Sequence, residues 1–298
     1  MDLLPFPRNK LAIYLINMAD AHERRETMLS RLSALGLAPD RIHAVDGRAL
    51  SFPMPEFSER SYKLLHGRRT CPPEIGCYLS HVECARSLLD SKAEFALVLE
   101  DDIVFEKDFL DSLSAALHQS DSWDILRLST VNDGRKFPFK RLTHSRSLAI
   151  SLTREKGAGA YVINRKAAQW IVTDLMPMRL AYDIAFDTEY LAGLKAAFIF
   201  PLCATQNADG GSQIQRNMRK FRLPGWRYFT VLPYRAYLET ARFLLRSAHL
   251  LVLKIRYRNE TLGERNVPEA SLVTPTPELV HTIFSDHAVV SPGVKPIR

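Results

Sequence analysis

Three consecutive acids, Glu100, Asp101 and Asp102, are the strongest chemical signal in the sequence. They directly follow residues 95–99, an apolar run typical of a strand buried on both faces of a parallel sheet. Ligands of open α/β sheets bind at the carboxyl ends of the strands. Adjacent carboxylates repel one another, and Mn²⁺ or Mg²⁺ bound together with a substrate diphosphate would relieve this repulsion. A solvated acidic turn is the alternative, and spacing alone favours neither interpretation.

The segments around the triplet alternate between strand patterns and helix patterns. This alternation predicts an α/β fold with a mostly parallel sheet over residues 11–205. Residues 51–73 contain prolines and show no period, so a long loop is expected there. The expected strands lie at residues 11–16, 41–45, 95–99, 124–129, 148–152, 157–164 and 197–201, and the expected helices follow Asp20 and cover residues 74–89 and 108–118.

Composition and charge indicate a globular, basic protein. The 298 residues are 46% hydrophobic and 24% charged with a net charge of +7, which disfavours intrinsic disorder. The four cysteines form no CxxC pair, so neither a disulfide framework nor a zinc framework is expected. The first residues lack a signal-peptide pattern, and no window reaches the ~18 uninterrupted apolar residues of a membrane span. We therefore expect a cytoplasmic protein with reduced thiols.

The composition changes after Ser212. Residues 216–258 contain eleven Lys or Arg and one acid, Glu239, interleaved with aromatic residues and leucines. This mixture favours a helical region that lies along an anionic membrane surface. Packing onto the catalytic domain with basic outer faces is the alternative. Nucleic-acid binding is a further hypothesis, but no RNP-like or zinc-knuckle pattern supports it, and we expect no nucleic acid. The expected parts are a catalytic domain at 1–212, a basic amphipathic region at 213–258 and a weakly ordered tail at 259–298.

Five motifs follow one another over about residues 11–215. They are IYLIN at 13–17 followed by ERR at 23–25, EIGCYLSH at 74–81, ALVLEDD at 96–102, GAGAYVINR at 157–165 and YD at 182–183. In this order they resemble glycosyltransferase family 25, which includes lipooligosaccharide and procollagen galactosyltransferases. The resemblance implies a GT-A fold, a UDP-sugar donor with galactose as its sugar, an inverting reaction and a metal held by the Glu-Asp-Asp motif.

The resemblance also implies roles for single residues. Asp102, with Glu100, would bind the metal and the diphosphate, and Asp101 and Glu100 would contact ribose, donor sugar or metal. Asp183 matches the family's late acidic position and is the implied catalytic base, although Ala181-Tyr182 replaces the usual proline and small apolar residue. Asp187 is the reserve candidate, and either acid could instead cap a helix. The remaining candidates for the donor pocket are Asn17, Arg24, Gly159, Tyr161, Gln206 and Ser212.

Together these patterns predict a metal-dependent hexosyltransferase that acts on a glycan acceptor such as lipooligosaccharide core or a surface polysaccharide. We expect it to be attached peripherally to the inner face of the membrane. A non-catalytic relative that serves as a binding or scaffold protein is the alternative, which the intact acidic triplet disfavours. A dinucleotide-dependent oxidoreductase is disfavoured because no GxGxxG follows the first strand. The donor sugar, the acceptor and the role of His81, either orienting an active-site group or packing in the core, stay open.

Overall fold

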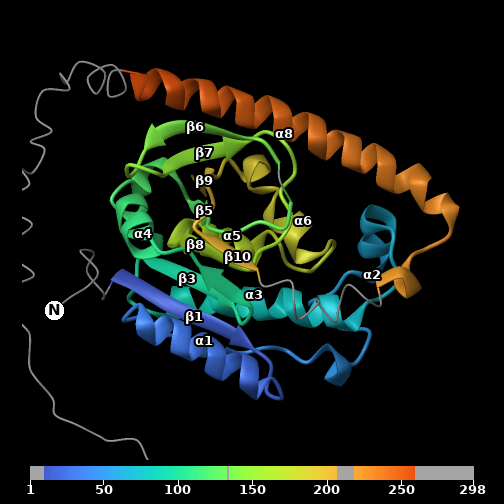
Figure 1. Ribbon diagram of the computed structural model, residues 1–298. Coiled ribbons are helices and arrows are strands. Elements are labelled where there is room, and N and C mark those ends of the chain that lie inside the picture. Colours follow the sequence, from blue (N-terminus) through green and yellow to red (C-terminus); the bar gives the residue numbers. More distant parts are fainter. Residues whose placement is uncertain (1–9, 133, 207–217, 259–298) are drawn as a thin grey trace, which may run out of the picture. The chain divides into compact units, whose positions relative to one another are not determined.

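Eight strands form the central sheet of the computed structural model, which describes residues 10–132, 134–206 and 218–258 (Figure 1). Their order across the sheet is β2-β1-β3-β8-β5-β9-β7-β6. Only β7 and β8 run antiparallel to the other six, which confirms the expected α/β fold with a mostly parallel sheet. The strands are β1 (Leu11–Asn17), β2 (Asp40–His43), β3 (Phe95–Glu100), β5 (Ile125–Arg127), β6 (Lys136–Arg141), β7 (Ser147–Ser151), β8 (Ala160–Asn164) and β9 (Ala196–Phe200).

Strand β3 places the acidic triplet at the carboxyl ends of the sheet's parallel strands. It lies between β1 and β8, and its residues are buried up to the last one, Glu100. The parallel register pairs Leu15 with Leu99 and Ile16 with Glu100, so β1 and β3 end side by side. Asn17, at the end of β1, therefore reaches the acids that follow β3.

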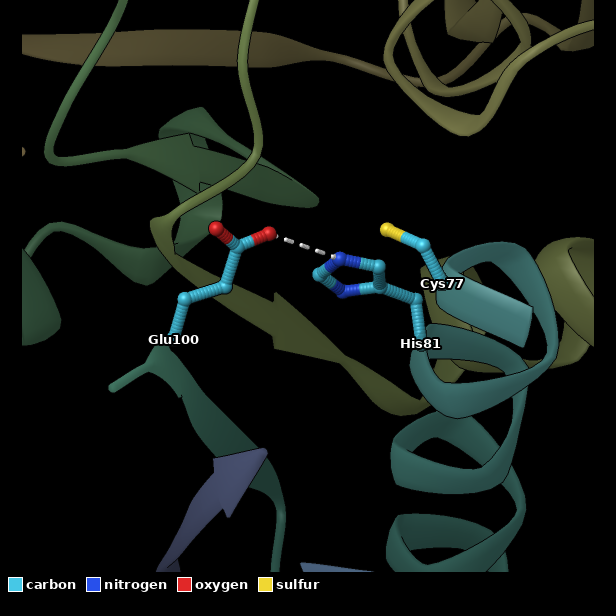
Figure 2. A group of neighbouring side chains, drawn as sticks. All are labelled: Cys77, His81 and Glu100. Carbon is cyan, nitrogen blue, oxygen red and sulfur yellow. Dashed lines mark hydrogen bonds and ion pairs between the residues drawn. The ribbon is translucent and has the colours of Figure 1, made fainter. Parts of the chain in front are cut away.

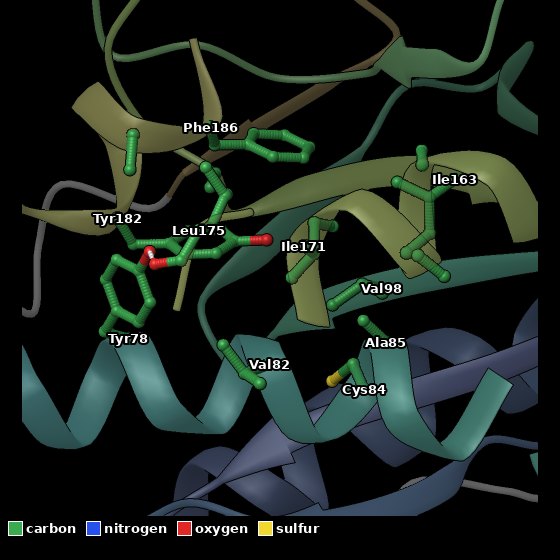
Figure 3. Close-up of a cluster of buried hydrophobic side chains, with 14 of the residues drawn as sticks. Tyr78, Val82, Cys84, Ala85, Val98, Ile163, Ile171, Leu175, Tyr182 and Phe186 are labelled. Atoms are coloured by element: carbon green, nitrogen blue, oxygen red, sulfur yellow. Dashed lines mark hydrogen bonds between the residues drawn. The ribbon is translucent and has the colours of Figure 1, made fainter. Parts of the chain in front are cut away.

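Alternate residues of β3 enter two apolar clusters, one on each face of the sheet, as the twofold repeat of a strand requires. Val98 faces the cluster built with α3 (Pro72–Asp90), α5 (Arg165–Thr173) and α6 (Tyr182–Phe186). Figure 3 shows part of this cluster, where the Tyr78 hydroxyl donates to the Leu175 carbonyl over 2.6 Å. Leu97 and Leu99 face the other cluster, to which α1 (His22–Ala34) and α4 (Phe109–Leu117) contribute.

The segment expected to be a long loop, residues 51–73, contains short helical turns. These are α2 (Glu59–Ser61) and η3 (Tyr62–His66), a π-helical turn. The aromatic side chains of Phe57 and Tyr62 are buried in the first cluster and fix this segment to the domain. Apolar residues without a clear period can thus anchor a segment that lacks long regular structure.

Two strand pairs were not expected from the sequence. Strand β6 forms a hairpin with β7, with an irregularity between Pro138 and Lys140 that interrupts the strand pattern. Strands β4 (Ile103–Phe105) and β10 (Ala204–Gln206) form a separate two-stranded sheet. Both strands have three residues, too few for a recognisable alternation. The antiparallel pairing brings Gln206 opposite Ile103, directly after the acidic triplet.

The basic C-terminal region is helical as expected, because α8 spans Tyr228–Arg256. The helix contacts η3, β6, β7 and the turn η5 (Glu189–Ala192) (Figure 1). Its inward side buries Val231, Leu238, Arg242, Arg246, Leu250 and Leu253. Among the described helices, none has a stretch that is both long and apolar enough to span a bilayer.

Candidate active site

Side chains from β10, β1 and α1 contact Glu100 and Asp101. The Glu100 Oε2 atom accepts a hydrogen bond from Gln206 Nε2 over 3.0 Å, and Asp101 accepts one from Asn17 Nδ2 over 2.7 Å. Arg24, from α1, lies 3.2 Å from Asp101 and keeps 54% of its side chain exposed. Asn17 is buried and bonded also to Ala21 and Arg41, so it orients Asp101 and has little surface for a nucleotide.

Asp102 has a carboxyl oxygen that lacks a hydrogen-bond partner among the described residues. Its Oδ1 atom is buried and accepts no hydrogen bond from the described part of the chain. Burial, together with the charges of Glu100 and Asp101, raises the pKa of Asp102 to about 6. A buried carboxyl oxygen without a donor, beside two further acids, fits a divalent cation, because such a cation accepts carboxylate oxygens and offsets their repulsion.

Gly159 lets two parts of the site approach closely. Its carbonyl accepts a hydrogen bond from the Glu100 amide over 2.8 Å. A Cβ at this position would lie 2.7 Å from Gln206 Nε2 and 2.9 Å from Ile103 Cδ1, so a larger residue would displace the side chain that holds Glu100. Gly159 and Gln206 therefore belong to one arrangement. Ser212 lies outside the described residues.

Two side chains of α3, Cys77 and His81, face Glu100 (Figure 2). Ligand-type atoms of Cys77, His81 and Glu100 all lie within 4.8 Å of one another. Cys77 and His81 are four residues apart and so share one face of the helix, a relation that CxxC spacing does not reveal. Burial, then the charges of Glu100 and Asp183, raise the pKa of the Cys77 thiol well above its usual value. Cys77 therefore lies near both carboxylates.

His81 connects the acidic triplet to α6. Its Nε2 atom lies 3.2 Å from Glu100 Oε1, and its Nδ1 atom lies 3.0 Å from the Tyr161 hydroxyl. The imidazole also stacks on Tyr182, with ring centres 4.2 Å apart. Tyr161 is fully buried and bonds to the Tyr182 hydroxyl over 3.1 Å, so its ring supports this network and does not face a sugar. Of the two roles left open for His81, its contacts favour orientation of Glu100.

Asp183 follows Tyr182 in the first turn of α6 and is partly exposed. Burial is the largest influence on its carboxyl group and raises its pKa, whereas the nearby charge of His66 acts in the opposite direction. A carboxylate with a raised pKa is a stronger proton acceptor than an ordinary surface acid. Asp183 thus combines partial access to solvent with the basicity that a general base needs.

Asp187, the reserve candidate for the base, is part of a buried ionic cluster. Its side chain is fully buried, and Arg127, Arg242 and Arg246 lie 3.4, 3.1 and 2.9 Å from its oxygens. Arg246 also forms a bidentate contact with Glu189. Asp187 therefore holds α8 against the domain, and an acceptor hydroxyl would have to displace buried arginines to reach it. This geometry favours Asp183.

The family model of glycosyltransferase family 25 (LPS biosynthesis protein) matches residues 10–186, which include the triplet, the α3 motif and Asp183. The chain belongs to glycosyltransferase family 25. The expected relationship is thereby confirmed, and the mixed α/β sheet agrees with the GT-A-like fold that it implies.

Two relatives of this family 25 chain are named as glycosyltransferases. Procollagen galactosyltransferase 1 of Danio rerio is 29% identical over 183 residues, 57% of this chain and 30% of the relative. A glycosyltransferase 25 family member of Aedes aegypti is 34% identical over 133 residues, 40% of this chain and 22% of the relative. The matches thus cover less than a third of each relative's length. Among solved structures, S. aureus TarS 1–349 in complex with UDP-GlcNAc aligns with 72% of this chain and 54% of that chain, at 11% identity and a TM-score of 0.36.

Proposed function

We propose that this protein is an inverting, metal-dependent glycosyltransferase that moves galactose from UDP-galactose to a glycan acceptor. The buried, unpaired Asp102 oxygen at the end of β3 is the observation that carries the proposal, because it marks where a cation and the donor diphosphate would bind. Membership of family 25 and the names of its relatives support the sugar-transfer chemistry and the choice of galactose.

In this proposal Asp102 and Glu100 hold Mn²⁺ or Mg²⁺, which when bound would offset the negative charge that develops on the leaving UDP. Arg24 supplies a partly exposed cation beside Asp101 and can contact the donor. Asp183 accepts the proton of the acceptor hydroxyl while that oxygen bonds to the anomeric carbon. The bond from this carbon to the UDP oxygen breaks on the opposite face, so the configuration inverts. Gln206 and His81 keep Glu100 in place.

The Asp102→Asn substitution tests this assignment. Turnover of UDP-galactose with Mn²⁺ should fall about a hundredfold or more, equivalent to roughly 2.7 kcal/mol of transition-state stabilisation, because the amide removes the charge that holds the cation. The measurement is the rate of UDP release. Asp111→Asn, an exposed change on α4, is the matched control and should keep the wild-type rate. Wild-type turnover in Asp102→Asn, or in excess chelator, would show that the metal assignment is wrong.

We further propose that the acceptor is a lipid-linked glycan, such as lipooligosaccharide core or a surface-polysaccharide precursor, presented at the inner face of the cytoplasmic membrane. The outward side of α8 exposes Leu244, Leu251 and Ile255, whose spacing places them on one stripe opposite the buried residues. Exposed Lys254 lies beside this stripe, and exposed Arg256 is in the same last turn of α8. An apolar stripe with nearby cations suits an anionic lipid surface better than a nucleic acid.

Vesicle flotation tests this membrane proposal. The protein should float with phosphatidylglycerol-containing vesicles at low salt, and binding should weaken with added salt because part of the attraction is ionic. Leu251→Glu should reduce binding, since it places a carboxylate on the apolar stripe. Gln169→Glu, on the exposed face of α5, adds the same charge elsewhere and should bind normally. If the folded wild type does not float with these vesicles at low salt, a soluble acceptor becomes the better proposal. Arg242 and Arg246 are unsuitable targets because they are buried.

A further inference from the structure

A cationic pocket lies between the segment after η3 and the first turns of α8. Its volume is about 210 Å³, well above the roughly 10–15 Å³ that a cavity needs to hold one water. Val231 and Leu232 form part of its wall. The charged and titratable side chains that line it are His66, Arg68, Arg222, Arg227, Tyr228 and Arg235.

Backbone contacts hold the walls of this pocket together. The Arg69 amide donates to the Phe221 carbonyl over 2.7 Å, and the Leu223 amide donates to the Gly67 carbonyl over 3.2 Å. Gly67 has a positive φ of 76°, and a Cβ there would lie 2.9 Å from Val231 Cγ2. Glycine therefore permits both the turn and the close approach to α8. The arginines consequently line a cavity whose two wall segments are joined by backbone hydrogen bonds.

The positive charge of the pocket exceeds the negative charge around it. Glu74 accepts from Arg68, and Glu239 accepts from Arg242 outside the pocket. In the described residues no carboxylate forms an ion pair with Arg222, Arg227 or Arg235. Burial, followed by the charges of neighbouring arginines, lowers the pKa of Arg235. Like charges held this closely repel one another, and a bound anion would remove the repulsion.

One further group of the pocket lacks a partner. His66 is only 5% exposed, and its Nδ1 atom has no hydrogen-bond partner in the part of the chain that the structure describes. Its Nε2 atom lies 3.5 Å from Glu74. A buried ring nitrogen without a partner, in the wall of an arginine-lined cavity, points to a ligand that offers oxygen atoms.

One residue of the pocket wall acts on the proposed catalytic base through its charge. His66 lies near enough to Asp183 for its charge to affect the pKa of that carboxyl group. Tyr228 and Leu232, which line the pocket, are exposed on α8. The cavity thus contains a histidine whose charge acts on Asp183, and it borders the helix proposed to meet the membrane.

We propose that this pocket binds a phosphate group of the acceptor, next to the sugar whose hydroxyl meets Asp183. This inference rests on the proposed glycosyl transfer. Several guanidinium groups match the multiple oxygens and the double charge of a phosphate better than the two oxygens of a single carboxylate. The phosphate belongs either to a lipid headgroup or to a soluble phosphorylated glycan.

Calorimetric titration with inorganic pyrophosphate, in saturating UDP to fill the donor site, tests the pocket. The wild type should bind, and Arg222→Gln/Arg235→Gln should bind about a hundredfold more weakly, about tenfold for each guanidinium removed. Arg86→Gln/Lys92→Gln removes the same charge from exposed positions elsewhere and should bind like the wild type. Equal affinity in the pocket variant and the wild type would overturn the proposal, as would complete loss of binding in UDP.

Binding to vesicles of different lipid composition distinguishes the two sources of phosphate. A preference for phosphatidic acid over phosphatidylserine that the pocket variant loses assigns the phosphate to a lipid headgroup, whereas pyrophosphate binding without that preference assigns it to a soluble acceptor. Acceptor-independent hydrolysis of UDP-galactose should persist in the pocket variant, because Asp102 is unchanged. Arginine-dependent pyrophosphate binding without any sugar turnover would support the pocket while contradicting the proposed function. Sugar turnover together with unaltered pyrophosphate binding in the pocket variant would support the proposed function and contradict the pocket.

Discussion

Asp183→Asn should leave the affinity for the UDP-sugar near its wild-type value while turnover falls by ~10²–10⁴-fold. The amide keeps the shape of the carboxylate but cannot accept the acceptor proton. Asp183 is suited to this role because its partly exposed carboxyl group has a raised pKa and follows Tyr182, which stacks on the histidine that holds Glu100. Calorimetry for donor binding and steady-state kinetics for kcat separate the two effects.

Asp187→Asn is the informative control for this prediction. Because Asp187 is buried among three arginines, its substitution should lower the stability of the protein and affect donor binding and turnover together. If the folded Asp187→Asn protein binds donor normally and loses turnover, while Asp183→Asn stays active, the base is Asp187 and the assignment made here is wrong.

Arg246→Met should lower the free energy of unfolding by about 3–5 kcal/mol. Arg246 is buried and bonds to Asp187, to both oxygens of Glu189 and to the Ser151 carbonyl. Methionine fills a similar volume but leaves Glu189 buried without its cation, and this uncompensated charge is the main source of the destabilisation. Urea unfolding, followed by circular dichroism, measures the change.

Lys254→Met, an exposed change on the same helix, should alter the free energy of unfolding by less than about 0.5 kcal/mol. A loss below about 1 kcal/mol in Arg246→Met would contradict the anchoring role of the buried cluster. A large loss in both variants would indicate that α8 responds to any loss of charge, and the specific contact with Asp187 and Glu189 would then carry little of the stability.

The acid triplet and its neighbours could be predicted because local sequence carries the necessary information. An apolar run followed at once by acids predicts a buried strand with ligands at its end, and β3 has this arrangement. The parallel register of β1 and β3 then brings Asn17 to Asp101. Gln206 also reaches Glu100, although its own strand has only three residues, too few for a local pattern to predict.

Contacts between distant segments explain what local patterns missed. The group of Cys77, His81 and Glu100 forms only when α3 packs beside the end of β3, and the arginine pocket forms only when η3 meets α8. In α8 the count of basic residues suggested an outward basic face. Helical spacing predicts otherwise for two of them. Arg242 and Arg246 share the stripe of Leu238 and Leu250 and therefore point inward.

The metal centre is tested most directly by nucleotide release from a panel of nucleotide sugars with Mn²⁺, measured for the purified wild type and for Asp102→Asn. We expect release of UDP from UDP-galactose in the wild type, dependent on the metal and reduced about a hundredfold or more in the variant. Release from no nucleotide sugar, with or without added glycan acceptor, or equal release by both proteins would contradict the claim that Glu100 and Asp102 form the centre of a metal-dependent glycosyltransferase.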